Sequence, residues 1–432
     1  MLFKNIDYCD ENFTVRRGNI AVRGDAIVSV SAEPPRGDFG EVIDGGGRLL
    51  LPGLVNAHCH VPMTLLRGYG EGLPLDRWLN ERVYPFEDLM TDEDAYWAGL
   101  LGIAEMLACG VTSFSDLYNF CESIAEAVKV SGIRANLSRG LVSFDGGALR
   151  DSFRFAEAVR LIDGWHGAEN GRILVDASIH AEYTSHEGFV RDLAAYAKER
   201  GVGVHIHLSE TKKEHGECVA NRGVTPAEYF ARAGVFDSRV TAAHCVHVTD
   251  SDMELLRQYN VTAVHCPSSN LKLGSGVAPI PKLLEKGVNV ALGTDGASSN
   301  NNLNLFEELH LAAMLHRGAA MNPSLLPPAE TLKIATANGA AAQGRGDTGV
   351  IREGYKADFA VLSLNKPHLT PVHDLLSDAV FAAQGSDVEL TVVDGKILYR
   401  DGKFLTFDVS EAMEKSAAAA RRIADSLRQS DE

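Results

Sequence analysis

The chain has 432 residues, of which 45% are hydrophobic and 23% are charged, so it is long enough to bury a large core. Its 41 basic and 58 acidic residues give a formal net charge of −17, which argues against nucleic acid or an anionic membrane as its partner. The sequence shows neither an apolar run of about 18 residues nor a secretory leader, and its seven cysteines form no CxxC pair. We therefore expect a cytoplasmic protein that binds a small molecule.

The first fifty residues alternate short β-rich runs with Gly and Asp turns, which predicts a small sheet. From Gly53 onward, short apolar strands alternate with helical stretches. Eight expected strands contain, in order, LVNAH, VTSFSD, IRANLSRG, RILVDASIH, VGVHIHLSE, RVTAAHC, VTAVHC and VNVALGTD. Because parallel strands need a crossover that is usually a helix, this alternation predicts an α/β fold, and eight units in roughly 300 residues predict a closed (β/α)₈ barrel of the TIM type.

Strands return near the C-terminus in KADFAVLSL, DVELTVVDG and KILYRDG, and we expect them to pair with the first strands. The predicted organisation is a small β-sandwich domain from residues 1–52 and 357–407, a (β/α)₈ barrel over 53–356, and a C-terminal helix over 408–432.

The C-terminal ends of barrel strands meet at one mouth, where titratable side chains indicate chemistry. The first strand ends in LVNAHCH, and His58 and His60 point to the same side because they are two positions apart in an extended segment. An HxH pair alone is also compatible with ordinary hydrogen-bonded residues. The fifth strand ends in HIHLSE, in which His207 lies nearer the mouth than His205, with Glu210 three positions further on.

The sixth and eighth strands end at His244 and Asp295, and each of these residues alone has a structural alternative. Four such strand ends in one barrel favour a metal site. The predicted ligands are His58, His60, His207 and Asp295. This set suits one divalent ion, zinc first, with iron or manganese as alternatives, and leaves a position for a water whose pKa the ion lowers to about 7. Glu210, His244 and Asp295 are the groups available for proton transfer.

The segments PGLVNAHCH, HIHLSE, AAHCVH and GTDGASSNN have the order and spacing of the metal motifs of the amidohydrolase superfamily, which the chain resembles over nearly its whole length. Members with two metals usually carry a carboxylated lysine at the end of strand four, where this sequence has His180 and no lysine. The resemblance therefore points to the single-metal deaminases. LPLDRWLNERVYPFE, ANLSRG and SIHAEYTS further resemble the 5-methylthioadenosine/S-adenosylhomocysteine deaminases.

This resemblance implies hydrolytic deamination of 6-aminopurine nucleosides, namely 5-methylthioadenosine, S-adenosylhomocysteine, adenosine and 5′-deoxyadenosine, to the inosine analogue and ammonia. It implies that Trp78 and Glu87 meet the nucleoside, with Glu87 accepting hydrogen bonds from the ribose hydroxyls, and that Arg139 and His180 complete the pocket. The structural alternatives are a loop anchor for Trp78, a surface carboxylate for Glu87 and an ion pair for Arg139. A homo-oligomer is also implied.

The sequence departs from the family at one position. A further arginine, a dozen residues after Arg139, helps to hold the amino-acid carboxylate of homocysteine in the family, and that place falls here at Asp151, with Arg150 adjacent. If Arg150 does not take over this task, S-adenosylhomocysteine should be a poorer substrate than the analogues without a carboxylate.

The resemblance also implies roles in the reaction. Glu210 donates a proton to purine N1 while water attacks C6, Asp295 takes the water proton and delivers it to the leaving amine, and His244 orients the attacking oxygen. We expect the asparagines at 300–302 to satisfy the loop backbone and to orient Asp295, and the two glutamates of the following FEEL stretch to be structural.

Two alternatives stay open. The first is another hydrolase of the same superfamily, such as a guanine, cytosine or triazine deaminase or a chlorohydrolase, against which Trp78 and Glu87 argue because they suit a ribose. The second is a barrel without catalysis that serves as a binding or assembly protein, which has no reason to retain four ligands together with Glu210 and His244.

Overall fold

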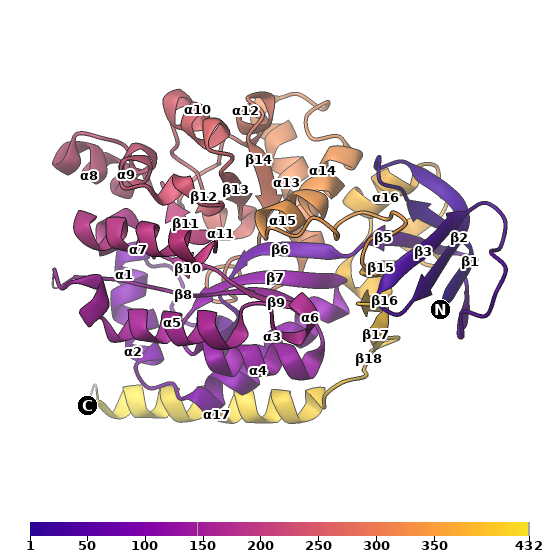
Figure 1. The fold of residues 1–432 in the computed structure, drawn as a ribbon, viewed down its shortest axis with the longest axis horizontal. Helices are drawn as coiled ribbons and strands as arrows, with labels where there is room; N and C mark the ends of the chain where they lie inside the picture. Colours follow the sequence, from indigo (N-terminus) through magenta and orange to yellow (C-terminus); the bar gives the residue numbers. More distant parts are fainter. Residues whose placement is uncertain (145, 431–432) are drawn as a thin grey trace.

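The computed structural model of the chain describes residues 1–144 and 146–430. Its central part is a TIM-barrel-like α/β arrangement in which parallel strands are surrounded by helices (Figure 1). The inner strands are β6 (Leu54–Cys59), β7 (Val111–Tyr118), β8 (Arg134–Arg139), β9 (Ile173–Val175), β10 (Ala177–Ser178), β11 (Val204–Leu208), β12 (Val240–His244), β13 (Thr262–His265) and β14 (Asn289–Leu292). They follow the predicted order.

Helices connect these strands along the chain. The larger ones are α3 (Asp92–Ala108), α4 (Cys121–Ser131), α5 (Phe153–Trp165), α7 (Glu187–Arg200), α8 (Lys212–Arg222), α9 (Pro226–Arg232), α10 (Asp250–Gln258), α11 (Pro267–Lys272), α12 (Ile280–Glu285), α13 (Leu305–Ala320), α14 (Pro328–Ile334) and α15 (Ala337–Ala342). Helices α3, α8, α9 and α10 each begin with a capping box, in which a threonine and an acidic residue three positions later satisfy each other's backbone N–H groups. The Thr-x-x-acid pattern therefore sets where these helices start.

The inner strands differ from the predicted closed ladder because they form two sheets, β6-β7-β8-β9 and β10-β11-β12-β13-β14. The predicted strand RILVDASIH is broken at Asp176, a buried residue whose carboxylate accepts hydrogen bonds from Asn136 Nδ2 (2.9 Å) and the Gly203 N–H (3.1 Å). Strand β9 consequently pairs with β8, and β10 pairs with β11. At the other seam, the Asp295 N–H donates to the carbonyl of His58 (3.0 Å), which joins the ends of the last and first strands.

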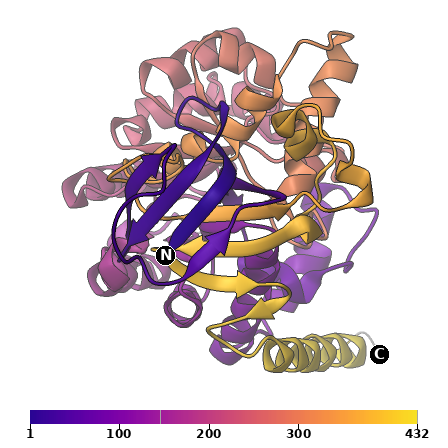
Figure 2. The same ribbon diagram turned by 90° about the vertical axis from the view of Figure 1, so that its right-hand side faces the viewer.

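Both ends of the chain contribute to a nine-stranded sheet (Figure 2). Its strands are β1 (Leu2–Cys9), β2 (Val15–Arg23), β3 (Ala26–Ser31), β4 (Val42–Asp44), β5 (Arg48–Pro52), β15 (Phe359–Ser363), β16 (Val388–Val393), β17 (Lys396–Arg400) and β18 (Lys403–Phe404). Strand β5 pairs antiparallel with β15. Because side chains alternate along a strand, Leu50 packs in a cluster with Phe3 and Phe359, while Leu49 and Leu51 pack in the larger core that includes the inner strands.

A buried ion cluster links the inner strands to the nine-stranded sheet. Arg134, the first residue of β8, donates from Nε to Asp358 Oδ2 (2.6 Å) and from Nη2 to Asp358 Oδ1 (3.1 Å), and it also contacts Asp394. Both acidic residues lie next to strands of the sheet, and Arg134 is 2% exposed. The guanidinium therefore bridges elements more than 200 positions apart along the chain.

We expect Arg134→Met to lower the free energy of unfolding by about 3–5 kcal/mol, because it leaves the two carboxylates buried without their cation. Denaturant unfolding followed by circular dichroism measures this change. Arg257→Met is the control, since it removes an arginine from an exposed pair with Glu254 and should change stability little. Equal stability of the two variants would refute the role of the buried cluster.

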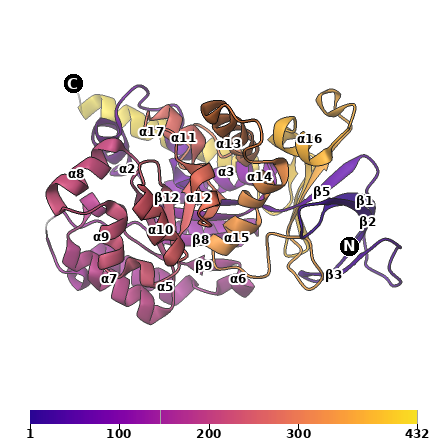
Figure 3. The same ribbon diagram turned by 90° about the horizontal axis from the view of Figure 1, so that it is seen from above.

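The last helix, α17 (Val409–Ser430), lies along the outside of α3 (Figures 1 and 3). Arg422 of this helix pairs with Asp94 in the first turn of α3. Residues 431–432 of the predicted helix 408–432 lie outside the described residues. Helix α16 (Leu375–Phe381) packs against α13 and α14. Within the described part of the chain, every helix is too short or too polar to cross a bilayer.

Candidate metal centre and active site

A cavity of about 650 Å³ opens where the inner strands end. Helix α2 (Tyr84–Glu87) contributes Tyr84 and Glu87 to the lining of this cavity. The helix lies far from the nine-stranded sheet, on the other side of the inner strands (Figure 1). Nine of the predicted residues line the cavity, namely His60, Trp78, Glu87, Arg139, His180, His207, Glu210, His244 and Asp295. The fold therefore gathers residues from most of the chain around one cavity, as expected at the C-terminal end of such strands.

Three of the strand ends leave their strands through left-handed backbone. Ser209, His244 and Asp295 have φ values of 49°, 74° and 60°. This conformation is costly for residues other than glycine and persists where the surrounding structure imposes it, which is typical of functional sites. The three turns surround the same cavity, and strain in the backbone thus coincides with the predicted chemistry.

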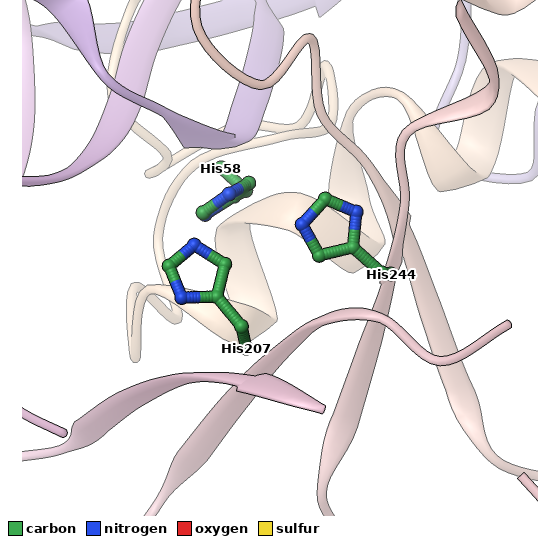
Figure 4. A group of neighbouring side chains, drawn as sticks. All are labelled: His58, His207 and His244. Carbon is green, nitrogen blue, oxygen red and sulfur yellow. The ribbon is translucent and has the colours of Figure 1, made fainter. Parts of the chain in front are cut away.

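The predicted metal ligands lie close together. Asp295 Oδ1 is 3.1 Å from His60 Nε2 and 3.4 Å from His58 Nε2, and His60 Nε2 is 3.4 Å from His207 Nε2. The ring of His244 also joins the cluster, because its ligand atom and those of His58 and His207 lie within 4.8 Å of one another (Figure 4). The described residues thus contain a candidate metal site with four imidazoles and one carboxylate.

Hydrogen bonds on the far side of the rings orient the imidazoles. His60 Nδ1 lies 2.5 Å from the carbonyl oxygen of Leu117, and His207 Nδ1 lies 2.7 Å from that of His180. Since a carbonyl only accepts, both Nδ1 atoms carry the proton, and both Nε2 atoms present lone pairs to the cluster. His58 Nε2 is buried and has no hydrogen-bond partner among the described residues. Three inward nitrogens and a carboxylate oxygen fit a divalent ion such as zinc.

Two serines orient the carboxylate of the cluster. Ser269 Oγ and Ser299 Oγ donate to Asp295 Oδ2 at 2.6 and 2.7 Å, which leaves Oδ1 facing the histidines. Burial opposes the charge of Asp295, but the neighbouring imidazoles of His58 and His60 hold its pKa well below its usual range. Asp295 is therefore a carboxylate that can serve as ligand and as proton acceptor.

The asparagines after Asp295 take only part of their predicted role. Asn300 Nδ2 donates to the carbonyl of Thr294 (2.8 Å) and to Glu308 (2.7 Å), so it satisfies the loop backbone as expected. In the described part of this loop, the Asp295 carboxylate accepts its hydrogen bond from Ser299 rather than from an asparagine. Glu308 also accepts the Ser268 N–H, which agrees with its predicted structural role.

Glu210 lies at the cavity wall beside His244. Its Oε2 is 3.8 Å from His244 Nε2, and its Oε1 accepts a hydrogen bond from Ser275 Oγ (3.4 Å). Burial raises the pKa of Glu210, which favours the protonated form that a general acid needs. On its other side, His244 Nδ1 lies 2.9 Å from Asn270 Oδ1, which fixes the ring with Nε2 toward the cavity. The pair thus combines a proton donor and an oriented imidazole.

Trp78 and Glu87 lie on one helical segment that lines the cavity. The segment runs through α1 (Leu75–Trp78), a π turn (Leu79–Val83) and α2. A π turn shifts the register of a helix and is frequent at functional sites. Both side chains line the cavity. Trp78 is therefore more than an anchor of the loop, and Glu87 is more than a surface carboxylate.

Tyr118 is a cavity residue that the sequence reasoning missed. Its hydroxyl donates to Glu87 Oε1 at 2.5 Å, and it ends strand β7. Burial raises the pKa of Glu87 to about 7, although the hydrogen bond from Tyr118 acts in the opposite direction. Tyr118 lies two positions after the expected strand VTSFSD, and this closeness to the end of a strand was a usable signal.

The remaining predicted residues differ in their placement. His180 lines the cavity with a buried Nδ1 that lacks a partner among the described residues. Arg139 lines the cavity and also pairs with Glu157 (2.7 Å), so the pocket role and the ion-pair alternative both have support. Arg150 is exposed on a short helical turn and is not among the described lining residues, whereas Arg154 is.

Comparison with known proteins agrees with this geometry. Residues 49–398 match the amidohydrolase family. The chain is 42% identical over 430 residues to the 5-methylthioadenosine/S-adenosylhomocysteine deaminase of Acetivibrio thermocellus, covering 98% of this chain and 99% of the relative. It is 41% identical over 409 residues to the 5′-deoxyadenosine deaminase of Methanothermobacter thermautotrophicus, covering 95% of each chain.

Among solved structures, an adenosine deaminase from Xanthomonas campestris with bound zinc is similar, with a TM-score of 0.92 at 31% identity over 98% of both chains. The family match over residues 49–398 spans the inner strands and part of the nine-stranded sheet. The chain belongs to the amidohydrolase family and, within it, to the 5-methylthioadenosine/S-adenosylhomocysteine deaminase family.

Proposed function

We propose that the protein is a metal-dependent deaminase of adenosine-type nucleosides, a hydrolase that acts on C–N bonds of cyclic amidines. The observation that carries this proposal is that one cavity is lined both by residues of the histidine and aspartate cluster and by the half-buried carboxyl of Glu87. The first group suits hydrolysis, and the second suits the two hydroxyls of a ribose. The names of the similar deaminases support the same substrate class.

One divalent ion per subunit would be held by His58, His60, His207 and Asp295, with zinc as the first choice and iron or manganese as alternatives. When bound, such an ion lowers the pKa of a bound water from about 15.7 to about 7. The zinc in a similar adenosine deaminase supports this assignment.

Each catalytic residue then has a defined task. Glu210 donates its proton to purine N1, which makes C6 more electrophilic. Asp295 accepts the proton of the attacking water and delivers it to the departing amine, while the Nε2 of His244 orients the attacking oxygen. The products are the 6-oxo nucleoside and ammonia, so one water is consumed per turnover.

The nucleoside would lie between the helical segment of Trp78 and the strand ends. Glu87 accepts the ribose hydroxyls, and Arg139 and His180 complete the wall of the pocket. Because Arg150 lies outside the cavity, we further propose that 5-methylthioadenosine, 5′-deoxyadenosine and adenosine are better substrates than S-adenosylhomocysteine.

We also propose that the inner strands act as one closed barrel over residues 53–356, that residues 1–52 and 357–407 form a small β-sandwich domain, and that 408–432 is a C-terminal helix. The separate apolar cluster of the nine-stranded sheet supports the small β-sandwich domain.

A cytoplasmic location is supported by the seven cysteines, which are all buried and free. The homo-oligomer that the resemblance implies is tested by light scattering.

The reaction itself is tested by mass spectrometry of 5-methylthioadenosine after incubation with the zinc-loaded protein. We expect the 6-oxo nucleoside with one equivalent of ammonia. Recovery of free adenine, or of unchanged substrate under conditions where the protein is folded and holds zinc, would refute the proposal.

Glu87→Gln should raise the KM for 5-methylthioadenosine by about 10- to 100-fold with a smaller effect on kcat, because a hydrogen bond to a charged group contributes about 1.5–3 kcal/mol. Burial raises the pKa of Glu87 to about 7, so below that pH the carboxyl is protonated and one oxygen can no longer accept a hydroxyl. In the wild type, kcat/KM should therefore fall as pH decreases through about 7.

Steady-state kinetics between about pH 5.5 and 8.5 measures this decrease in kcat/KM. The exposed Glu81→Gln on the same helical segment is the control and should keep the wild-type KM. An unchanged KM of Glu87→Gln would show that Glu87 does not bind the ribose hydroxyls.

A further inference from the structure

The strongest feature that the proposed reaction leaves unused is the buried carboxylate of Glu214, which lies behind Glu210. Its Oε1 accepts the Ser209 N–H at 2.8 Å, and its Oε2 accepts the Glu210 N–H at 2.7 Å and the Thr211 N–H at 3.3 Å. One side chain from the first turn of α8 therefore binds three consecutive backbone donors. Both of its oxygens act as acceptors.

This arrangement exceeds what the start of a helix requires. In an ordinary capping box the acidic residue reaches only the backbone N–H of the threonine, and α9 has this pattern, with the Thr225 N–H donating to Glu228 Oε2 at 3.1 Å. Glu214 makes the corresponding bond to Thr211 and two shorter bonds further back along the chain. The two additional bonds connect α8 to the turn at the end of β11.

The turn that Glu214 holds is conformationally costly. Ser209 has a φ of 49°, and the N–H groups of Ser209 and Glu210 are buried. If the carboxylate were absent, both donors would lack a partner, which costs about 1–3 kcal/mol for each group. Because the direction of the Glu210 side chain follows from the φ and ψ angles of this turn, release of the turn would move the Glu210 carboxyl away from its place beside His244.

A second buried carboxyl group, that of Glu182, lies next to Glu214. Glu182 is 1% exposed, and burial raises the pKa of both carboxyl groups. Two carboxyl groups buried side by side favour a shared proton over two charges. The three N–H donors that face Glu214 oppose the rise in its pKa, because they favour its charged form.

We propose that Glu214 is a positioning residue for Glu210, whose carboxylate fixes the turn from Ser209 to Thr211 so that the acid faces the substrate. The inference rests on the proposed deamination, because it concerns the residue that protonates the purine. It requires two acceptor oxygens at position 214. Glutamine offers one acceptor and one donor, and its NH₂ group would face a backbone N–H, whereas aspartate retains both acceptors on a shorter side chain.

The test compares Glu214→Gln, Glu214→Asp and Glu228→Gln, with Glu228→Gln as the matched control in an ordinary capping box. We expect Glu214→Gln to lower kcat by about 10²-fold, the effect of a small misplacement of a catalytic group, with KM within about threefold and wild-type zinc content. Glu214→Asp should recover part of this loss. Glu228→Gln should keep kcat within about twofold, since glutamine is accepted in a capping box.

A double-mutant cycle separates positioning from stability. In the Glu210→Gln background, Glu214→Gln should cost no more than about twofold, because the group that it positions is already absent. The same factor in both backgrounds, or a normal kcat with only a lower unfolding temperature, would overturn the inference.

A readout independent of activity is hydrogen–deuterium exchange of the amides of residues 209–211. Exchange there should be faster in Glu214→Gln than in the wild type and in Glu228→Gln. Unchanged exchange would overturn the proposal. If the wild type deaminates no nucleoside, the proposed function fails, and exchange still decides whether Glu214 fixes the turn.

Discussion

Glu210→Gln should lower kcat by about 10²- to 10⁴-fold, the usual contribution of a general acid or base. Glutamine has nearly the same shape but holds no acidic proton for purine N1. The buried position of Glu210 raises its pKa and favours a protonated carboxyl in the wild type, although the hydrogen bond from Ser275 acts in the opposite direction. Steady-state ammonia release, with zinc content measured on the same samples, tests this result.

The matched control is Glu217→Gln, the same substitution at an exposed position of α8. It should leave both kcat and zinc content at wild-type values. If Glu210→Gln retained wild-type kcat, another group would have to protonate the purine. If it lost zinc, Glu210 would belong to the metal ligands.

His207→Ala should abolish metal binding and, with it, activity. The substitution removes the nitrogen that lies 3.4 Å from His60 Nε2 and leaves a gap in the cluster. Ligand binding to the native state stabilises a protein, so added zinc should raise the unfolding temperature of the wild type and leave that of the variant unchanged. Metal analysis after dialysis, together with thermal unfolding with and without zinc, provides the measurement.

His205→Gln is the corresponding control on the same strand. His205 Nε2 lies 2.9 Å from His58 Nδ1, so it supports a predicted ligand from outside the cluster. Its replacement should weaken zinc binding by about 10- to 100-fold and still permit full occupancy at high zinc. If His207→Ala kept one equivalent of tightly bound zinc, His207 would not be a required ligand, and the remaining residues of the cluster, with His244 among them, would hold the ion.

The residues of the metal cluster could be predicted because two general rules place them. Polar groups at the ends of parallel strands meet at one edge, and residues two apart in a strand share a side. His58, His60, His207 and Asp295 satisfy one or both rules, and the structure brings them together. The order of strands and helices was predictable for the same reason, since it follows from local periodicity.

The groups that orient these residues were harder to predict. Ser269 and Ser275 lie 26 and 65 positions from the carboxylates that they contact, and serine is common in loops, so neither position nor composition distinguishes them. Arg154, and not Arg150, lines the cavity. Which of the two arginines does so depends on how the chain turns before α5, and no periodic pattern specifies this turn.

Where the prediction of one continuous strand was wrong, a signal was present. Asp176 interrupts an otherwise apolar segment, and a buried carboxylate needs hydrogen-bond donors, here Asn136 and the backbone of Gly203. These donors separate β9 from β10. A buried acid in the middle of a strand therefore indicated a break in the ladder.

The most direct test of the account is the kcat/KM of the zinc-loaded protein for 5-methylthioadenosine, 5′-deoxyadenosine, adenosine, S-adenosylhomocysteine and guanine, with Glu210→Gln as the inactive control. We expect turnover of the nucleosides, with S-adenosylhomocysteine the poorest of them, and no turnover of guanine. Deamination of guanine alone, or nucleoside turnover that Glu210→Gln leaves intact, would contradict this expectation.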